Sequence, residues 1–308
     1  MIFAVTLETF KQLTASGIIN GAQYALLGVA FALILGVTGR FHFAFGFTYA
    51  LTAYFIYQLN DQWGVPFWPA VVVALVVITL VGMSMESFLY RPLARRAGAT
   101  ALLAIFVASL GVGIAGENLI RLVWGSDTKA LLGMNQEVIT SWDIIYFNID
   151  VYSVLSSVAL ILILAAVLRF TGLGRMIKAT RVNPEMAQII GINPNVIYVV
   201  CFGIGTLFGG VGAMWYGLKF SVTPDMGFKP VIFAFVVAFL AGTASSPIRV
   251  LIVGFGVSLV EQWSSIWLEA RWTQTAVFVL LLAYLVSLSL NLTRFKGRLR
   301  PSGALAEG

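Results

Sequence analysis

Long uninterrupted apolar runs are the feature of this sequence that most restricts its fold. At 1.5 Å per residue, about twenty helical residues cross a hydrocarbon core of about 30 Å. Inside that core every backbone N–H and C=O must be paired internally, which leaves helices or closed barrels, and barrel strands are shorter and alternate in polarity. We therefore predict an all-α, polytopic membrane bundle of about nine (eight to ten) transmembrane helices, forming a single transmembrane domain over 1–308. The nine apolar segments are 17–38, 43–58, 67–90, 99–120, 152–170, 195–218, 228–243, 248–266 and 273–290.

Composition supports a membrane protein over a soluble one. Hydrophobic residues make up 59% of the chain and charged residues only 10%, whereas soluble domains have about 45–50% and about 25%. The net charge of +6 does not indicate nucleic-acid binding, because the basic residues form short clusters between the apolar runs. The first residues lack the basic region and cleavage site of a signal peptide.

The distribution of basic residues predicts the orientation. With nine crossings and the N-terminus outside, thirteen of the nineteen Lys and Arg residues fall on the cytoplasmic side, as the positive-inside rule requires. The C-terminus is then cytoplasmic, 121–151 is an extracytoplasmic loop and 171–194 is a cytoplasmic loop. Segments 43–58 and 228–243 are short enough to be tilted, broken or re-entrant. If both were re-entrant, two basic clusters would lie outside, against the rule.

The cytoplasmic loop contains signals for a helix of about two turns. Asn183 is a typical N-cap, and Pro184 suits the first helical position because its missing N–H would be unpaired there. Glu185 adds negative charge at the positive end of the helix dipole. Gly191 can adopt the left-handed conformation that ends a helix, and Pro194 prevents its continuation.

This short helix has an apolar side that must be buried against another surface. Met186, Ile189 and Ile190 lie three and four residues apart and share one side of the helix. Either that side packs on the protein's own surface or the lipid headgroups, or a partner protein covers it.

Polar residues inside the apolar segments are candidates for a translocation path, because such groups are costly at membrane depth and normally face a bundle interior. The candidates are Asn20, Gln23 and Tyr24 in the first segment and Ser109 and Asn118 in the fourth. Hydrogen bonding between helices is an equally good explanation.

Three further polar or reactive residues have structural interpretations. Glu86 lies near the inner end of the third segment, and we expect it to snorkel to the membrane interface or to pair with Arg91 or Arg95. The single histidine, His42, is a poor candidate for a metal ligand, because metal sites normally need three or four ligands. The single cysteine, Cys201, excludes an internal disulfide. No catalytic cluster is evident, so we predict neither catalytic nor metal-binding residues.

Several stretches resemble the branched-chain amino acid type of ABC importer permease. The most specific is GRMIKATRVNPEMAQIIGIN, in which Glu185, Ala187 and Gly191 occupy the family's acidic, Ala and Gly positions. Also similar are NGAQYALLGVAFALILGVTGRFHFAFG, MESFLYRPLARR and LAGTASSPIRVLIVGFGVSLVEQ. The sequence departs from the family where members commonly read Asn-Phe-Ala-His-Gly-Glu, since it has aromatic residues at Phe45 and Phe47. His42 and Phe45 in this altered motif complete the candidate pathway residues.

The resemblance implies a permease subunit in a bacterial inner membrane, without an ATPase site or cofactor of its own. It implies a second permease subunit (identical or different), two cytoplasmic ABC ATPases that hydrolyse ATP, an extracytoplasmic substrate-binding protein and surrounding membrane lipid. The cargo would be amino acids or similar small polar compounds. No G-x-x-x-x-G-K-[ST] phosphate loop occurs in the sequence, which agrees with a separate ATPase.

The resemblance also makes 184–192 a coupling helix that binds the ATPase. Its coupling residues would be Asn183, Pro184, Glu185, Met186, Ala187, Ile190, Gly191 and Ile192. The alternative is a self-sufficient secondary transporter or channel, but such a protein gives no reason for a capped helix in this loop.

Overall fold

The computed structural model describes residues 7–242, 245–269 and 272–298, and it is helical along most of that length. Thr243 and Ala244 of the C-terminal family motif, together with Arg271 and Arg300, lie outside the described residues. The α-helices are α1 (Leu7–Thr38), α2 (Phe45–Tyr57), α3 (Phe67–Ser84), α4 (Arg91–Ala97), α5 (Ala101–Trp124), α6 (Asn148–Phe170), α7 (Gly172–Val182), α8 (Pro184–Ile189), α9 (Pro194–Lys219), α10 (Phe228–Ala241), α11 (Pro247–Ser264) and α12 (Thr273–Arg298). Short π-helical and 3-10 turns lie at Gln58–Gln62, Met85–Tyr90 and Gly98–Thr100.

Five helical stretches among the described residues are long and apolar enough to cross a membrane. They are Leu7–Thr38, Phe67–Ala97, Ala101–Trp124, Asn148–Phe170 and Pro194–Lys219. The shorter apolar helices are Phe228–Ala241 and Thr273–Ser287. The chain is therefore a multi-pass helical membrane protein, whereas nine crossings and a single domain over 1–308 stay predictions.

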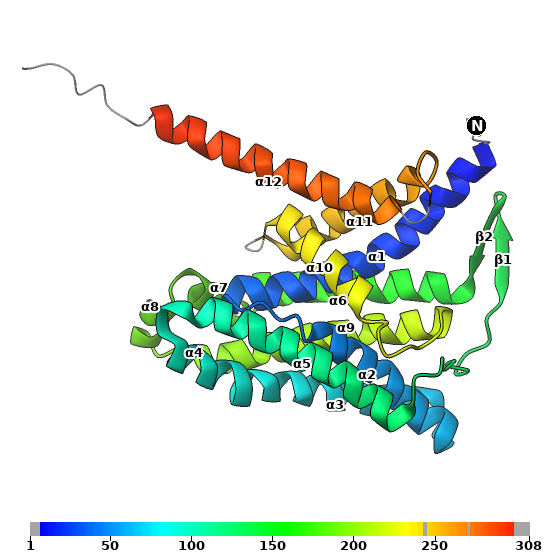
Figure 1. The fold of residues 1–308 in the computed structure, drawn as a ribbon, viewed down its shortest axis with the longest axis horizontal. Coiled ribbons are helices and arrows are strands. Elements are labelled where there is room, and N and C mark those ends of the chain that lie inside the picture. Colours follow the sequence, from blue (N-terminus) through cyan, green and yellow to red (C-terminus); the bar gives the residue numbers. More distant parts are fainter. Residues whose placement is uncertain (1–6, 243–244, 270–271, 299–308) are drawn as a thin grey trace, which may run out of the picture.

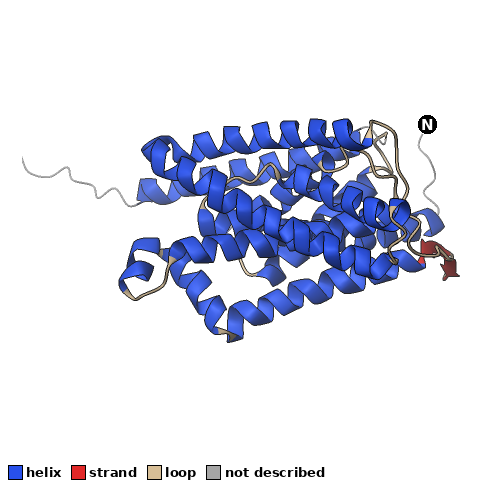
Figure 2. Cartoon of the chain, turned by 90° about the horizontal axis from the view of Figure 1, so that it is seen from below, coloured by secondary structure: helices blue, strands red, loops and turns tan. Residues whose placement is uncertain are grey.

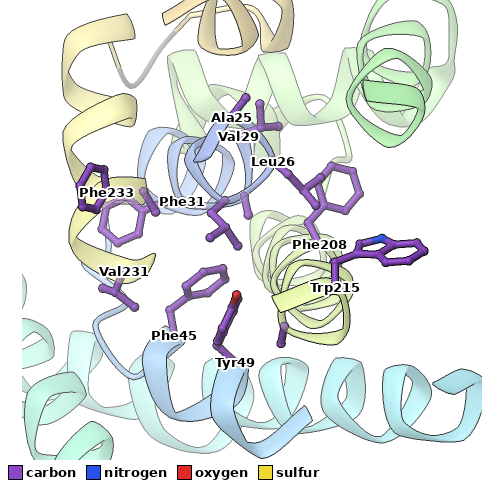
Figure 3. Packing of buried hydrophobic residues seen from close by; sticks show 14 of the residues in the cluster. Ala25, Leu26, Val29, Phe31, Phe45, Tyr49, Phe208, Trp215, Val231 and Phe233 are labelled. Atoms are coloured by element: carbon purple, nitrogen blue, oxygen red, sulfur yellow. The ribbon is translucent and has the colours of Figure 1, made fainter. Parts of the chain in front are cut away.

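Helices α1 and α9 form the centre of the bundle (Figure 1). In each of them 67% of the most apolar stretch is buried, compared with 22% in α5 and α6. Figure 3 shows Phe45 and Tyr49 extending from α2 into the space between α1 and α9, with Val231 and Phe233 of α10 beside them. The peripheral helices therefore leave their apolar faces for lipid or a second subunit, and α1 and α9 bury theirs within the chain.

The short segments 43–58 and 228–243 contain the half-length helices α2 and α10, of 13 and 14 residues. Residues 39–44 between α1 and α2 are not helical, so they interrupt the helical path between the two. The two helices begin beside each other, because a Cβ built on Gly46 would lie 3.2 Å from the carbonyl oxygen of Gly227. A Cβ on Gly227 would collide with the backbone of Gly46. Only glycine allows the two backbones to approach this closely.

The two ends of the bundle carry different elements (Figures 1 and 2). At the end where α1 begins, strands β1 (Val138–Ser141) and β2 (Ile144–Phe147) form an antiparallel hairpin. This hairpin departs from the predicted all-α fold. It forms because backbone groups of the polar loop 121–151 hydrogen-bond to one another across two short strands. The side-chain amide of Gln12 donates to the carbonyl of Ile145 at 2.8 Å and accepts from the Ile145 N–H at 2.9 Å. Helices α7 and α8 lie at the opposite end.

Candidate functional site

Three of the predicted pathway residues share one cavity in the half of the bundle nearer the hairpin. Asn20, Gln23 and Tyr24 line a space of about 190 Å³ between α1, α2, α9 and the start of α10. The three-residue and four-residue spacing places their side chains on one face of α1. The remaining lining residues are Leu27, Tyr49, Tyr216, Phe220, Lys229 and Pro230.

A polar network closes one side of this cavity. The Tyr24 hydroxyl donates to Glu261 Oε2 at 2.9 Å, and Lys229 Nζ lies 3.3 Å from Glu261 Oε1. The Glu261 side chain is 5% exposed, whereas that of Lys229 is 48% exposed. The Tyr24 ring also stacks on Phe233 at 4.3 Å between centroids. The cavity thus presents a hydroxyl, an ammonium group and amides beside aromatic rings, which suits a small polar solute.

Sequence reasoning did not assign Tyr49, Tyr216, Lys229 or Glu261 to this cavity. Lys229 lies at the start of the apolar segment 228–243, and Glu261 lies near the end of the segment 248–266. A charge of each sign at the hairpin-side ends of two neighbouring apolar segments was the available signal. The sequence contains no such signal for Tyr49 and Tyr216, because tertiary packing decides which faces of α2 and α9 meet α1.

A second cavity of about 320 Å³ lies between α2, α5 and the start of α10. Phe43, Phe47, Leu110 and Phe228 contribute most of its apolar lining, and Glu117 and Asp225 are its two acidic residues. Glu117 is held by Arg121 of the same helix at 2.5 Å. The two cavities lie along α2 and the first turn of α10, so the broken helices border both.

His42 and Phe45 are buried in the packed interior and do not reach the Tyr24 cavity. His42 Nδ1 lies 2.9 Å from the Tyr90 hydroxyl, and its ring meets that of Phe202 edge-on at 5.1 Å. Phe45 is fully buried between α1 and α9 (Figure 3).

Ser109 and Asn118 of α5 are also separate from that cavity. Ser109 is buried, accepts a hydrogen bond from the Phe43 N–H at 3.2 Å and donates to the Phe106 carbonyl at 2.9 Å. Asn118 is exposed and donates to Ile114 of its own helix at 2.8 Å. Ser109 therefore bonds to a segment outside its own helix, which agrees with a packing role and not with a place in the path. Asn118 lies on the outer face of the bundle.

The prediction that Glu86 snorkels to the interface or pairs with Arg91 or Arg95 is wrong. Glu86 forms an ion pair with Arg40, in the broken segment after α1, and both side chains are buried. The Arg40 guanidinium also lies 5.1 Å from the centre of the Tyr198 ring. Arg91 instead donates to the carbonyl of Asn195 at 3.0 Å. The partner could not be read from sequence spacing, because 46 positions separate the two residues of the pair.

Helix α8 is capped at both ends in the predicted manner. The Asn183 side-chain oxygen accepts from the N–H groups of Glu185 and Met186, both at 3.0 Å, and Pro184 occupies the first turn. At the other end Gly191 has a φ of 86°, which favours glycine. The Ile192 N–H donates to the Ala187 carbonyl at 2.9 Å, completing a Schellman-type ending.

The outer side of α8 is apolar and uncovered within the described structure. Met186, Ile189 and Ile190 are 61%, 78% and 70% exposed, and Ala187 faces inward with 2% exposure. The preceding helix α7 was not predicted, because its small buried side rests on the bundle and the rest is polar. It buries Gly174, Ile177 and Thr180 at three-residue spacing.

The described residues hold no group of three or more His, Cys, Asp or Glu side chains that could bind a metal ion. Cys201 is buried inside α9, as an apolar side chain would be.

Comparisons with known proteins agree with the resemblance. Residues 13–286 match the family model described as branched-chain amino acid transport system / permease component. The chain is 25% identical to the high-affinity branched-chain amino acid transport system permease protein LivH of Escherichia coli K12, over 90% of this chain and 93% of that protein. It is 28% identical to the corresponding permease protein BraD of Pseudomonas aeruginosa, over 77% of this chain and 81% of that protein. No solved structure matches the chain significantly.

Proposed function

Since the chain belongs to the permease family of the branched-chain amino acid transport system, we propose that it is the membrane subunit of an ATP-driven importer. Its family consists of transport subunits whose ATPase is a separate chain. The proposed assembly contains two permease subunits, identical or different, in a bacterial inner membrane. Two cytoplasmic ATPases and an extracytoplasmic binding protein complete it.

The observation that carries this proposal is helix α8. Its backbone is hydrogen-bonded at both ends, and three large apolar side chains on its outer side are exposed. Exposed apolar clusters on a charged end of a protein typically mark interaction sites. A short rigid helix of this kind fits a groove on an ATPase, where movement of the ATPase would displace α8 as a unit. In this arrangement the N-terminus and the hairpin are outside and the C-terminus is cytoplasmic.

The cargo we propose is an amino acid or a similarly small polar compound. The relatives are named for branched-chain amino acids, which fits a small cavity lined by both aromatic and polar groups. Lys229 and Glu261 offer opposite charges, and a zwitterion carries the complementary pair. Asn20, Gln23 and Tyr24 would then line part of the path, and ATP would be bound only by the partner subunits.

The test is a pull-down of the tagged protein in mild detergent, with crosslinking and mass spectrometry. We expect an ATPase to co-purify and its crosslinks to map to residues 180–195. An oligomer of this chain alone that transports in liposomes without ATP would refute the proposal.

Variants of α8 sharpen the same test. Glu185→Lys reverses the charge at the helix N-terminus, and Gly191→Pro cannot adopt the left-handed conformation at its end. Both should separate ATP hydrolysis from uptake while the protein still inserts. The matched control is Glu137→Lys, the same charge reversal in an exposed residue beside the hairpin, which should leave ATPase co-purification unchanged. Normal coupling in both α8 variants would contradict the coupling role.

A further inference from the structure

A deep groove lies at the α7–α8 end of the bundle, away from both cavities described above. Its volume is about 470 Å³, and helices α1, α6, α7 and the start of α11 form its walls. Along its length the lining is apolar, with Val29, Leu33 and Val37 from α1 and Leu164 and Leu168 from α6. These α6 residues occupy the last two turns of a helix that is long and apolar enough to cross a membrane.

The mouth of the groove is basic. Arg169, Lys178 and Arg181 line it where α6 ends and α7 passes over it, and none of the described residues that line the groove is acidic. Among the described residues, none of these three cations lies within ion-pair distance of a carboxylate; the ion pairs of the described structure involve other Lys and Arg residues. The positive charge at the mouth is therefore available to a ligand.

Two other cavities lack this arrangement. The space between α2, α5 and α10 is bordered by the carboxylates Glu117 and Asp225. A shallower depression along α3 is lined by apolar residues and Ser84, without a charged group. Unlike these two cavities, the α1–α6–α7–α11 groove joins an apolar channel to a cluster of unpaired cations.

We propose that this groove binds an anionic phospholipid, with an acyl chain along α1 and α6 and the phosphate at Arg169, Lys178 and Arg181. The apolar part of the groove matches the acyl chain of a lipid, and its basic mouth matches an anionic headgroup. Basic pockets between transmembrane helices typically bind such headgroups. A soluble phosphate would use only the mouth and leave the apolar channel empty. The site is distinct from the transport path and from the exposed side of α8.

The experiment is native mass spectrometry of the full-length protein titrated with phosphatidylglycerol or with phosphatidylcholine. We expect the wild type to retain phosphatidylglycerol preferentially. The triple variant R169Q/K178Q/R181Q should bind it on the order of 100-fold more weakly, since each cation near an anionic lipid contributes about fivefold. The matched control R95Q/R96Q/R175Q removes three exposed cations from the same end but outside the groove, and should bind within about twofold of the wild type.

A second variant tests the apolar channel and does not depend on the triple variant folding. Ala165 lines the groove, and Ala165→Trp fills it without changing charge, so it should also lose phosphatidylglycerol. Equal loss in the control and groove triple variants would overturn the proposal, because general surface charge would then explain binding. Competition by inorganic phosphate as strong as that by phosphatidylglycerol, or normal lipid binding in Ala165→Trp, would also overturn it.

Discussion

Two ion pairs that join distant segments of this bundle occupy contrasting environments. Arg40 and Glu86 have side chains 7% and 0% exposed, and they connect the broken segment after α1 to the π-helical turn after α3. Lys229 and Glu261 have side chains 48% and 5% exposed, and they connect α10 to α11 beside the Tyr24 cavity. A sealed pair must be fully compensated inside the protein, whereas a pair with one accessible member can exchange partners with water or a solute. We infer that the first pair maintains the fold and that the second is available for transport.

The largest effect is expected for Glu86→Gln, which leaves the Arg40 charge buried without its partner. Breaking a buried pair in this way costs about 3–5 kcal/mol of the free energy of unfolding. Thermal unfolding of the purified protein in detergent measures it. The double variant R40M/E86Q removes both charges and should recover most of the loss, and a double variant as unstable as the single one would contradict the inference.

The chemically identical change Glu261→Gln should cost much less stability, about 1 kcal/mol, because Lys229 can be solvated. Uptake by the assembled transporter should nevertheless fall, since the Tyr24 hydroxyl and the Lys229 ammonium lose their charged partner. The two substitutions are compared by thermal unfolding and by uptake of radiolabelled substrate in vesicles. If Glu261→Gln destabilised as much as Glu86→Gln, the contrast between the two pairs would be lost.

A smaller effect is expected for Gln23→Ala, which removes an amide from the cavity but breaks no ion pair. Uptake should decrease several-fold, on the scale of about 1 kcal/mol, while the unfolding temperature stays close to that of the wild type. Uptake at several substrate concentrations would separate weaker binding from slower transport. Unchanged uptake with an unchanged fold would remove Gln23 from the path.

The smallest effect is expected for Asn118→Ala. Its side chain is exposed and bonds only within α5, so stability should change by less than about 0.5 kcal/mol. Uptake should also stay near the wild-type rate, which makes this variant the control for Gln23→Ala. A large loss of uptake in Asn118→Ala would show that the outer face of α5 takes part in transport or subunit contact.

Local signals in the sequence predicted several features of the structure. The cap at Asn183 and the ending at Gly191 depend on neighbouring residues, so the sequence was sufficient to place helix α8. Asn20, Gln23 and Tyr24, predicted from their polarity within an apolar run, do line one cavity. Long apolar runs predicted the five helical stretches that are long and apolar enough to cross a membrane, because the bilayer constrains each run independently.

Features set by packing between distant segments were not predictable. The pairing of Glu86 with Arg40 requires knowing that the segment after α1 lies against the end of α3. His42 and Phe45 are buried because α2 begins inside the bundle, which apolarity alone does not indicate. Helix α7 has too small an apolar side to distinguish it from a polar loop.

The contact between Gly46 and Gly227 has a mechanical consequence. Side chains normally separate neighbouring helices, and their rotations absorb small shifts of one helix before the next one moves. Between the starts of α2 and α10 no side chain intervenes, so a displacement of α10 by a fraction of an ångström passes directly to α2. These half-helices border both cavities. A movement of α10 would therefore alter the walls of both cavities together, with the glycine contact acting as a rigid link between the two half-helices.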